Sequence, residues 1–255
     1  MSWIDRKKKV MLSVKRIFSY SSLFIVASAV TASGGQDGSY EGLIEPSEVV
    51  NVGSQVRGIL EEIMVERGDR VKKGQVIVTL NANIEKAAVN LARARVEFSR
   101  RKVLRNRDLY KKKLISIHDK DEMETELRIT ELQFREAEAK LELRTIHSPV
   151  DGVVVERFLG PGEYVGEEPI MKIARIDPLY VEVVVPVEKF GTIKKGMKAE
   201  VRPEPPLRGR YRARVIIVDR VMDAASGTFG VRLELANPSY YLPAGLKCRV
   251  VFPSG

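Results

Sequence analysis

The sequence has little cysteine, little histidine and few aromatic residues. Cys248 is the single cysteine among 255 residues, which excludes a disulfide framework and any metal site built from several thiolates. The two histidines, His118 and His147, are too few for a histidine-rich metal centre. No combination of nucleophile, base and acid stands out either. We therefore expect no catalytic site, no bound metal and no cofactor.

Hydrophobic residues make up 44% of the chain and charged residues 30%, which favours a folded protein with about one to three modest domains. The net charge of +9 would by itself suggest a polyanionic partner. Six basic residues and one acidic residue lie within residues 1–32, so the remainder carries only +4, which is +9 less +5. The densest basic stretch, residues 100–113, has few aromatic side chains among its cations, so we expect no nucleic-acid partner.

The N-terminus is typical of an export signal. Basic residues up to Arg16 precede 13 uncharged residues, 17–29, a run that is short for a membrane span of about 20 residues. Small residues follow at Ala29 and Ala32 in the A-x-A pattern of cleavage sites. We predict a signal peptide or signal anchor over residues 1–32, with cleavage preferred and retention left open. Translation from Met11 instead of Met1 is also left open.

The chain repeats itself at an offset of 94 residues. Each copy has the form G-[IV]-x9-G-[DE]-x-V, with short β-branched runs that predict strands. The glycines predicted to form tight turns are Gly58, Gly68, Gly152 and Gly162. Two copies are too few for a solenoid, so we expect residues 49–80 and 145–176 to close on each other as one sandwich. Residues 33–48 are expected to form a linker or an N-terminal strand.

This repeat resembles the two halves of a biotinyl or lipoyl carrier domain. In such carriers the modified lysine lies on the short hairpin that joins the halves. Residues 81–144 occupy that junction here, so the resemblance implies the fold and not the swinging-arm chemistry. A biotin or lipoyl carrier-like subunit of an enzyme complex stays as an alternative function.

The insert is predicted to be an α-helical hairpin. Residues 84–113 contain no glycine or proline, and apolar positions recur there every seven residues. The two rows are Ile84, Leu91 and Phe98, and Val89, Val96, Val103 and Tyr110. A second helix is predicted from about Asp119, where Leu127, Phe134 and Leu141 repeat the spacing. The short turn between them favours an antiparallel coiled-coil hairpin.

Charge divides between the two predicted helices. Residues 84–113 carry a net +8, and residues 119–142 carry a net −5. Opposite helices placed side by side attract, within the hairpin or between copies of the chain, although exposed pairs are worth only about 0.2–1 kcal/mol each.

The C-terminal part, residues 177–255, is predicted to be a β-barrel domain. Alternating or β-branched runs at residues 211–218, 229–235 and 246–252 are separated by glycine, proline and asparagine turns. The fold class expected is therefore mainly β with an α-helical insert. Its parts are a split lipoyl-like β-sandwich, an antiparallel coiled-coil hairpin and a C-terminal β-barrel domain.

In this order, the segments resemble the membrane fusion proteins of the hemolysin-D type, which are the periplasmic adaptor subunits of efflux pumps. The resemblance covers residues 49–251. T-I-x-S-P-x-D-G at residues 145–152 resembles the family's return into the second lipoyl half. Residues 179–188 resemble the family's first barrel strand, and residues 226–232 and 242–246 resemble its closing strands.

This resemblance implies a non-enzymatic adaptor in the periplasm of a Gram-negative envelope, associated with the inner membrane. It would link an inner-membrane transporter, of the resistance-nodulation-division or ABC type, to an outer-membrane efflux channel for efflux or secretion. Copies of the chain would form a homo-oligomeric ring, a hexamer by resemblance. A coiled-coil scaffold without a transport role is a further alternative.

The motif with the most specific spacing lies at the predicted hairpin tip. Adaptors of tripartite efflux pumps carry R-x3-L-x6-S there, which in that family contacts the outer-membrane channel, and this chain matches it with Arg105, Leu109 and Ser116. Four residues place Arg105 and Leu109 on one helical face. The hydroxyl of Ser116 would bond to a partner or cap the next helix. The alternative is that Leu109 packs within the hairpin and Ser116 only supports the turn.

The fullest family members have a membrane-proximal domain after the barrel. The sequence ends at Gly255, soon after the last predicted strand, so we expect that domain to be missing. This expectation favours an ABC-type transporter over one of the resistance-nodulation-division type.

Overall fold

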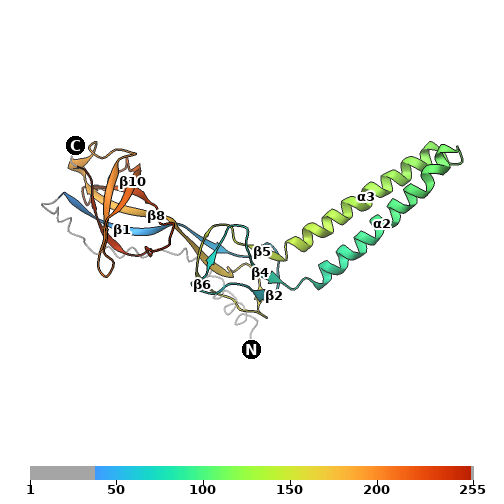
Figure 1. Cartoon of the computed structure of the whole chain (residues 1–255), viewed down its shortest axis with the longest axis horizontal. Coiled ribbons are helices and arrows are strands. Elements are labelled where there is room, and N and C mark those ends of the chain that lie inside the picture. Colours follow the sequence, from blue (N-terminus) through green and yellow to red (C-terminus); the bar gives the residue numbers. More distant parts are fainter. Residues whose placement is uncertain (1–37, 254–255) are drawn as a thin grey trace, which may run out of the picture. The chain divides into compact units, whose positions relative to one another are not determined.

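The computed structural model describes residues 38–253 (Figure 1). The predicted signal, residues 1–32, and the first residues of the expected linker lie outside the described residues. The strands are β1 Ser39–Val52, β2 Gly58–Ile63, β3 Arg70–Val71, β4 Val76–Leu80, β5 Thr145–His147, β6 Gly152–Arg157, β7 Tyr164–Val165, β8 Met171–Pro186, β9 Lys198–Pro203, β10 Tyr211–Val218, β11 Thr228–Leu235 and β12 Lys247–Val251. The helices are α2 Asn83–Lys111 and α3 Ile117–Glu142, and a 3-10 turn, η1 Val187–Lys189, follows β8.

The two longest strands, β1 and β8, are each shared between the barrel and the sandwich. They pair antiparallel from Gly42 opposite Val183 as far as Pro46, and again from Glu48 to Val52 after a bulge. One half of each strand therefore belongs to each core. Of the two forms expected for residues 33–48, the described part is an N-terminal strand, and this strand continues past the expected boundary at residue 48.

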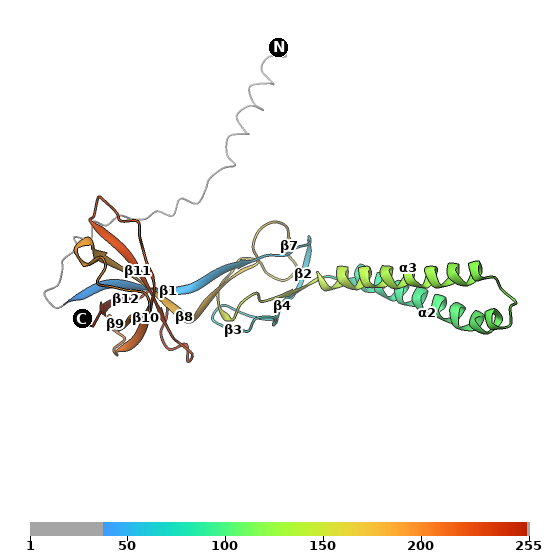
Figure 2. The ribbon, with the colours of Figure 1, turned by 90° about the horizontal axis from the view of Figure 1, so that it is seen from above.

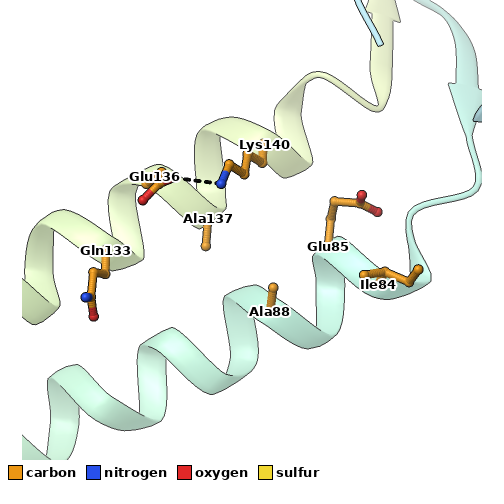
Figure 3. Close-up of a pocket in the computed structure, with 7 residues that line it drawn as sticks. All are labelled: Ile84, Glu85, Ala88, Gln133, Glu136, Ala137 and Lys140. Atoms are coloured by element: carbon orange, nitrogen blue, oxygen red, sulfur yellow. Dashed lines mark hydrogen bonds and ion pairs between the residues drawn. The ribbon is translucent and has the colours of Figure 1, made fainter. Parts of the chain in front are cut away.

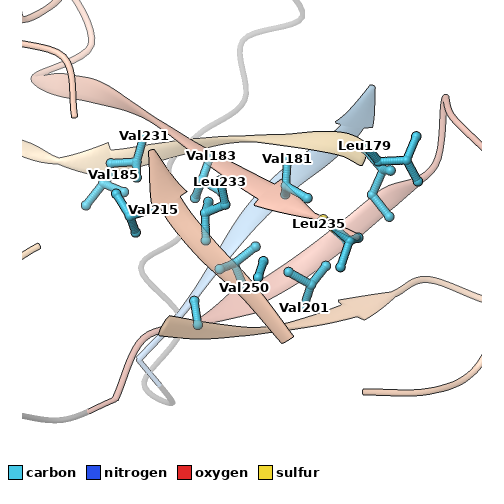
Figure 4. Packing of buried hydrophobic residues seen from close by; sticks show 14 of the residues in the cluster. Leu179, Val181, Val183, Val185, Val201, Val215, Val231, Leu233, Leu235 and Val250 are labelled. Carbon is cyan, nitrogen blue, oxygen red and sulfur yellow. The ribbon is translucent and has the colours of Figure 1, made fainter. Parts of the chain in front are cut away.

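The barrel closes in the strand order β1, β12, β9, β10, β11 and β8, with the β1–β8 pairing completing the ring. The three runs predicted as strands, 211–218, 229–235 and 246–252, match β10, β11 and β12, so this prediction is confirmed. Alternate residues of β8 point inward from Leu179 to Val185 and are all buried, as period-two strands require (Figure 4). Burying each such side chain stabilises the barrel by roughly 1.5–3 kcal/mol.

The sandwich confirms the internal repeat, because its two halves exchange matching contacts. β2 and β6 begin 94 residues apart, and so do β3 and β7. Gly58 of the first half pairs with Val165 of the second half, and Gly152 of the second half pairs with Val71 of the first half. The amide of Gly162 donates to the carbonyl of Leu60 at 2.8 Å, and the amide of Gly68 donates to that of Val154 at 2.9 Å. Each half thus supplies the same edge contacts to the other.

The repeated glycines have two different structural reasons. Gly68 and Gly162 have φ of 96° and 86°, in the left-handed region, and are turn glycines as predicted. Gly58 and Gly152 are the first residues of β2 and β6, so their prediction as turn residues is wrong. A β-carbon at Gly152 would collide with the carbonyl of Ala174, and one at Gly58 would lie 2.6 Å from Nη1 of Arg144. These two glycines permit close approach instead.

The helices α2 and α3 lie side by side in both views (Figures 1 and 2). Arg100 pairs with Glu131 at 3.1 Å and Lys102 with Glu126 at 2.8 Å, a register that runs in opposite directions along the two helices. The antiparallel helical hairpin is therefore confirmed, with α3 beginning two residues before the expected Asp119. At about 1.5 Å per residue, α2 is about 43 Å long.

We expect Gly152→Ala to destabilise the fold by about 1–3 kcal/mol, because the added methyl group meets a backbone carbonyl that cannot rotate away. Gly166→Ala is the matched control, since a β-carbon there meets nothing nearer than the ring of Tyr164 at 3.7 Å. Denaturant unfolding of both variants measures the difference. Equal stability of the two would show that the close approach at Gly152 is not a constraint.

Candidate docking site at the hairpin tip

The packing between α2 and α3 uses one of the two predicted apolar rows. Val89 and Val96 are buried, with 5% and 8% exposed surface. The other row faces solvent, with Ile84, Leu91 and Phe98 at 81%, 56% and 58% exposed. Only one of the two apolar rows therefore packs within the hairpin. An isolated pair of helices buries only the stripe of each helix that faces the other, and a second stripe on α2 has no partner within the hairpin.

The base of the hairpin is fixed to the sandwich by Arg144, which directly precedes β5. Its guanidinium donates to Glu85 of α2 at 2.6 Å and to the carbonyl of Arg57 at 2.9 Å. Burial acts to raise the pKa of Glu85, but hydrogen bonds from its own backbone amide and from Arg144 together hold that pKa below its ordinary value. One side chain therefore orients the helix pair on its support.

A hollow of about 210 Å³ separates the helices near this base (Figure 3). Ala88 of α2 and Ala137 of α3 point into it, and their small side chains do not fill the space. Its charged pair, Glu136 with Lys140 at 2.6 Å, lies along α3 alone. The hollow arises because two alanines face each other across the helix pair. Its polar side chains do not converge on one point, so we assign it no binding role.

The end of α2 closes in a Schellman arrangement. The amide of Leu114 donates to the carbonyl of Leu109 at 2.9 Å, and the amide of Lys113 donates to that of Tyr110 at 2.8 Å. Lys113 has φ of 59° at the position where glycine is usual. In this motif the residues at Leu109 and Leu114 are hydrophobic neighbours, and here they are 36% and 67% exposed.

Ser116 begins α3 as its N-cap. Its hydroxyl accepts a hydrogen bond from the amide of Asp119 at 3.1 Å and donates to the Asp119 carboxylate at 2.7 Å, while that carboxylate also accepts from the Ser116 amide. This is a reciprocal capping box. The hydrogen bond from the Ser116 side chain, followed by that from its backbone amide, lowers the pKa of Asp119. The cap was one of the two roles expected for Ser116.

The structure places all three motif residues at the tip. Arg105 and Leu109 are exposed and one turn apart on α2, and Ser116 is exposed at the start of α3. Sequence reasoning missed two apolar neighbours of Ser116, namely Leu114 and Ile117, of which Ile117 is 58% exposed. The sequence contained a sign of this surface. Three of the four residues from Leu114 to Ile117 are apolar, although the turn between two helices is usually polar.

The comparison with protein families decides the membership of this chain. The model of the CzcB-like barrel-sandwich hybrid domain matches residues 48–175, which is half of the chain. The chain belongs to the membrane fusion protein family. The resemblance inferred from the sequence is thereby confirmed. The matched range contains the second half of β1, both sandwich halves, the hairpin and the first part of β8.

Two curated relatives are similar in sequence to this membrane fusion protein. Multidrug resistance protein MdtE of Escherichia coli is 26% identical over 239 residues, covering 82% of this chain and 62% of MdtE. The pyoverdine export membrane fusion protein PvdR of Pseudomonas aeruginosa is 24% identical over 190 residues, covering 62% of this chain and 49% of PvdR. The chain therefore spans about half to two thirds of the length of these relatives.

The fold of this membrane fusion protein agrees with a solved one. A MacA–MexA chimera that contains the Pseudomonas aeruginosa MexA α-hairpin domain aligns with a TM-score of 0.70 at 20% identity, covering 83% of this chain and 79% of the chimera. The predicted fold class of sandwich, helical hairpin and barrel is confirmed. Supercoiling of the helices as a coiled coil stays a prediction.

We expect Ser116→Ala to destabilise the first turn of α3 by about 1 kcal/mol, because the backbone amide of Asp119 loses its cap. The pKa of Asp119 should rise toward its ordinary value in this variant. Because folding lowers that pKa, the cap stabilises the helix above the ordinary aspartate pKa and loses this effect as the pH falls through the lowered one. Hydrogen exchange of residues 117–120 and an NMR titration of Asp119 measure both effects. Ser116→Asn, which keeps a capping oxygen, is the control.

Proposed function

We propose that the protein is a non-enzymatic periplasmic adaptor that links an inner-membrane transporter to an outer-membrane channel for efflux or secretion. The observation that carries the proposal is the combination of the family's hybrid domain with a long helical hairpin whose tip bears the motif residues. Two relatives of this chain are named for multidrug resistance and for pyoverdine export. The transporter is of the resistance-nodulation-division or ABC type.

The hairpin tip is the proposed contact with the outer-membrane channel. Arg105 and Leu109 share one exposed face of α2, and Leu114 and Ile117 add apolar surface next to them. Their backbone is held by the Schellman arrangement and by the capping box. Because the hydroxyl of Ser116 is engaged by Asp119, we assign Ser116 the task of holding this loop in shape. The tip offers a partner a preformed surface that combines the cation of Arg105 and its basic neighbours with the apolar side chains of Leu109, Leu114 and Ile117.

Arg105→Asp combined with Leu109→Asp should abolish export while leaving the protein folded and bound to its transporter. Both side chains are exposed, so their replacement costs the hairpin little, whereas an apolar and cationic contact would be lost. The measurement is the export or resistance phenotype of cells that carry the variant in place of the natural chain.

Arg101→Asp combined with Leu104→Asp is the matched control, because it changes the same exposed residue types about one turn earlier on α2. We expect this control to retain export. Normal export by the Arg105 and Leu109 variant would rule out the tip assignment, and equal loss in both variants would show a general effect on the hairpin.

We also propose that copies of the chain assemble side by side as a ring, hexameric by resemblance. The stripe of Ile84, Leu91 and Phe98 supports this, because it is exposed and has no partner within its own hairpin. The net charges of +8 and −5 on the two helical segments would let α2 of one copy face α3 of the next.

Leu91→Asp combined with Phe98→Asp should shift the protein from a ring toward monomers, since a charge on the stripe cannot be buried against a neighbour. Tyr241→Asp, which alters a side chain 60% exposed in the barrel domain, is expected to leave assembly unchanged. Light scattering of the purified proteins at matched concentration reports the mass. A ring that persists with both aspartates would exclude this stripe as the contact.

A further inference from the structure

One end of the barrel carries exposed apolar side chains among lysines and an arginine. This is the end where β8 stops and β9 starts, because the antiparallel order places the end of β8, the start of β9 and the end of β10 together. We define the barrel-end patch by its members. They are Phe190, Ile217, Val221 and Met222, with Lys194, Lys195 and Arg220.

A groove of about 470 Å³ lies within this patch. The loop after η1 lines one side with Phe190, Lys194 and Lys195, and the end of β10 and Arg220 line the other. Every residue that lines it is either hydrophobic or cationic. The groove is therefore suited to a ligand that combines an apolar part with a negative charge.

The apolar members of the patch are exposed to an unusual degree. Val221 is 86% exposed on the hairpin that follows β10, and Phe190 and Ile217 are 45% and 42% exposed. Phe190 is held in place by an edge-on contact with Phe229, with ring centroids 5.4 Å apart. These side chains are exposed at the surface of the barrel, and no other part of the barrel covers them.

Two carboxylates near the patch are engaged by other parts of the barrel. The carboxylate of Asp219 lies over Gly230 of β11. That of Asp223 accepts hydrogen bonds from the amide of Ala225 and the hydroxyl of Ser226 within its own turn, which lowers its pKa and keeps it ionised there. Lys194, Lys195 and Arg220 are left facing solvent beside apolar side chains.

The first strand of the barrel starts at the same end. β1 begins there at Ser39, which pairs with Val251 at the end of β12. Only nine residues, 30–38, separate β1 from the apolar run of residues 17–29, and nine extended residues span at most about 30 Å. A run retained as a signal anchor would therefore keep its bilayer within about 30 Å of the start of β1.

We propose that the barrel-end patch binds the surface of a bilayer that contains anionic phospholipid. Aliphatic and aromatic tips surrounded by cations match the boundary between acyl chains and negative headgroups. The inference assigns a surface to the inner-membrane association that the family resemblance implies. It is independent of channel docking, because it concerns the opposite part of the fold from the hairpin and can be measured without any partner protein.

The test places an environment-sensitive thiol dye on the full chain at Val221→Cys. Cys248 does not compete for the dye, because it is 1% exposed and burial raises its pKa to about 12. The same dye at Tyr164→Cys, a position 59% exposed in the sandwich, is the control for binding through any other segment. Vesicles of phosphatidylglycerol with phosphatidylcholine are compared with vesicles of phosphatidylcholine alone.

We expect the emission at position 221 to shift to the blue on anionic vesicles only, and the emission at position 164 to stay unchanged. Adding Lys194→Glu, Lys195→Glu and Arg220→Glu should reduce the docking equilibrium constant about a hundredfold, at about fivefold for each cation lost. Lys112→Glu with Lys113→Glu at the hairpin tip should leave the shift intact.

Three results would overturn the proposal. The first is an unshifted dye on anionic vesicles, including the case in which it shifts only on membranes that contain a transporter, since the occupant would then be a protein. The second is an equal shift on phosphatidylcholine alone. The third is a shift that survives the triple charge reversal. None of these results bears on export through the hairpin tip.

Discussion

The antiparallel pairing of β1 with β8 is the constraint on which both β cores depend. It joins residues about 130 positions apart and is interrupted only by the bulge after Pro46. On one side of the bulge it closes the barrel, and on the other it completes the sandwich. Pairing at this sequence separation requires a large loop-closure entropy to be overcome before either core gains its burial. The two cores are therefore coupled through two continuous strands and not through a flexible linker.

The same closure explains how the sandwich accommodates a helical insert. β4 ends and β5 begins side by side, with Thr79 opposite Thr145 and the amide of Leu80 donating to the carbonyl of Arg144 at 2.8 Å. An insertion whose two ends are already adjacent in the fold costs little additional closure entropy. The contact of Arg144 with Glu85 then makes the insert an oriented extension of the sandwich. The repeat supplies the junction, and one ion pair sets the direction of the helices.

The features predicted from the sequence are those encoded by local periodicity. Alternation predicted β10, β11 and β12 almost to the residue, the 94-residue offset predicted the paired halves, and heptad spacing predicted both helices. What was missed depends on partners far along the chain. The first half of β1 is a barrel strand only because β12 and β8 flank it. Likewise Gly152 is required by the distant Ala174 carbonyl and not by a turn.

The three motif residues lie at the tip of the hairpin, but they are not the only exposed side chains there. A spacing motif identifies side chains that share a face, so it found Arg105 and Leu109. It does not report how the backbone turns between two helices. The Schellman arrangement and the capping box settle that turn, and they are what leaves Leu114 and Ile117 exposed beside Ser116.

The distribution of charge on the hairpin favours assembly over isolated stability. Among the residues that the structure describes, two ion pairs, Arg100 with Glu131 and Lys102 with Glu126, join α2 to α3. Exposed pairs of this kind contribute about 0.2–1 kcal/mol each, which is too little to account for segments of +8 and −5 as a device for holding one hairpin together. Most of the charged side chains of the hairpin are exposed to solvent, as are Leu91 and Phe98. A surface that is basic on one helix and acidic on the other is complementary to a copy of itself placed alongside in the same direction. The segregation therefore supports the proposed assembly with neighbouring copies.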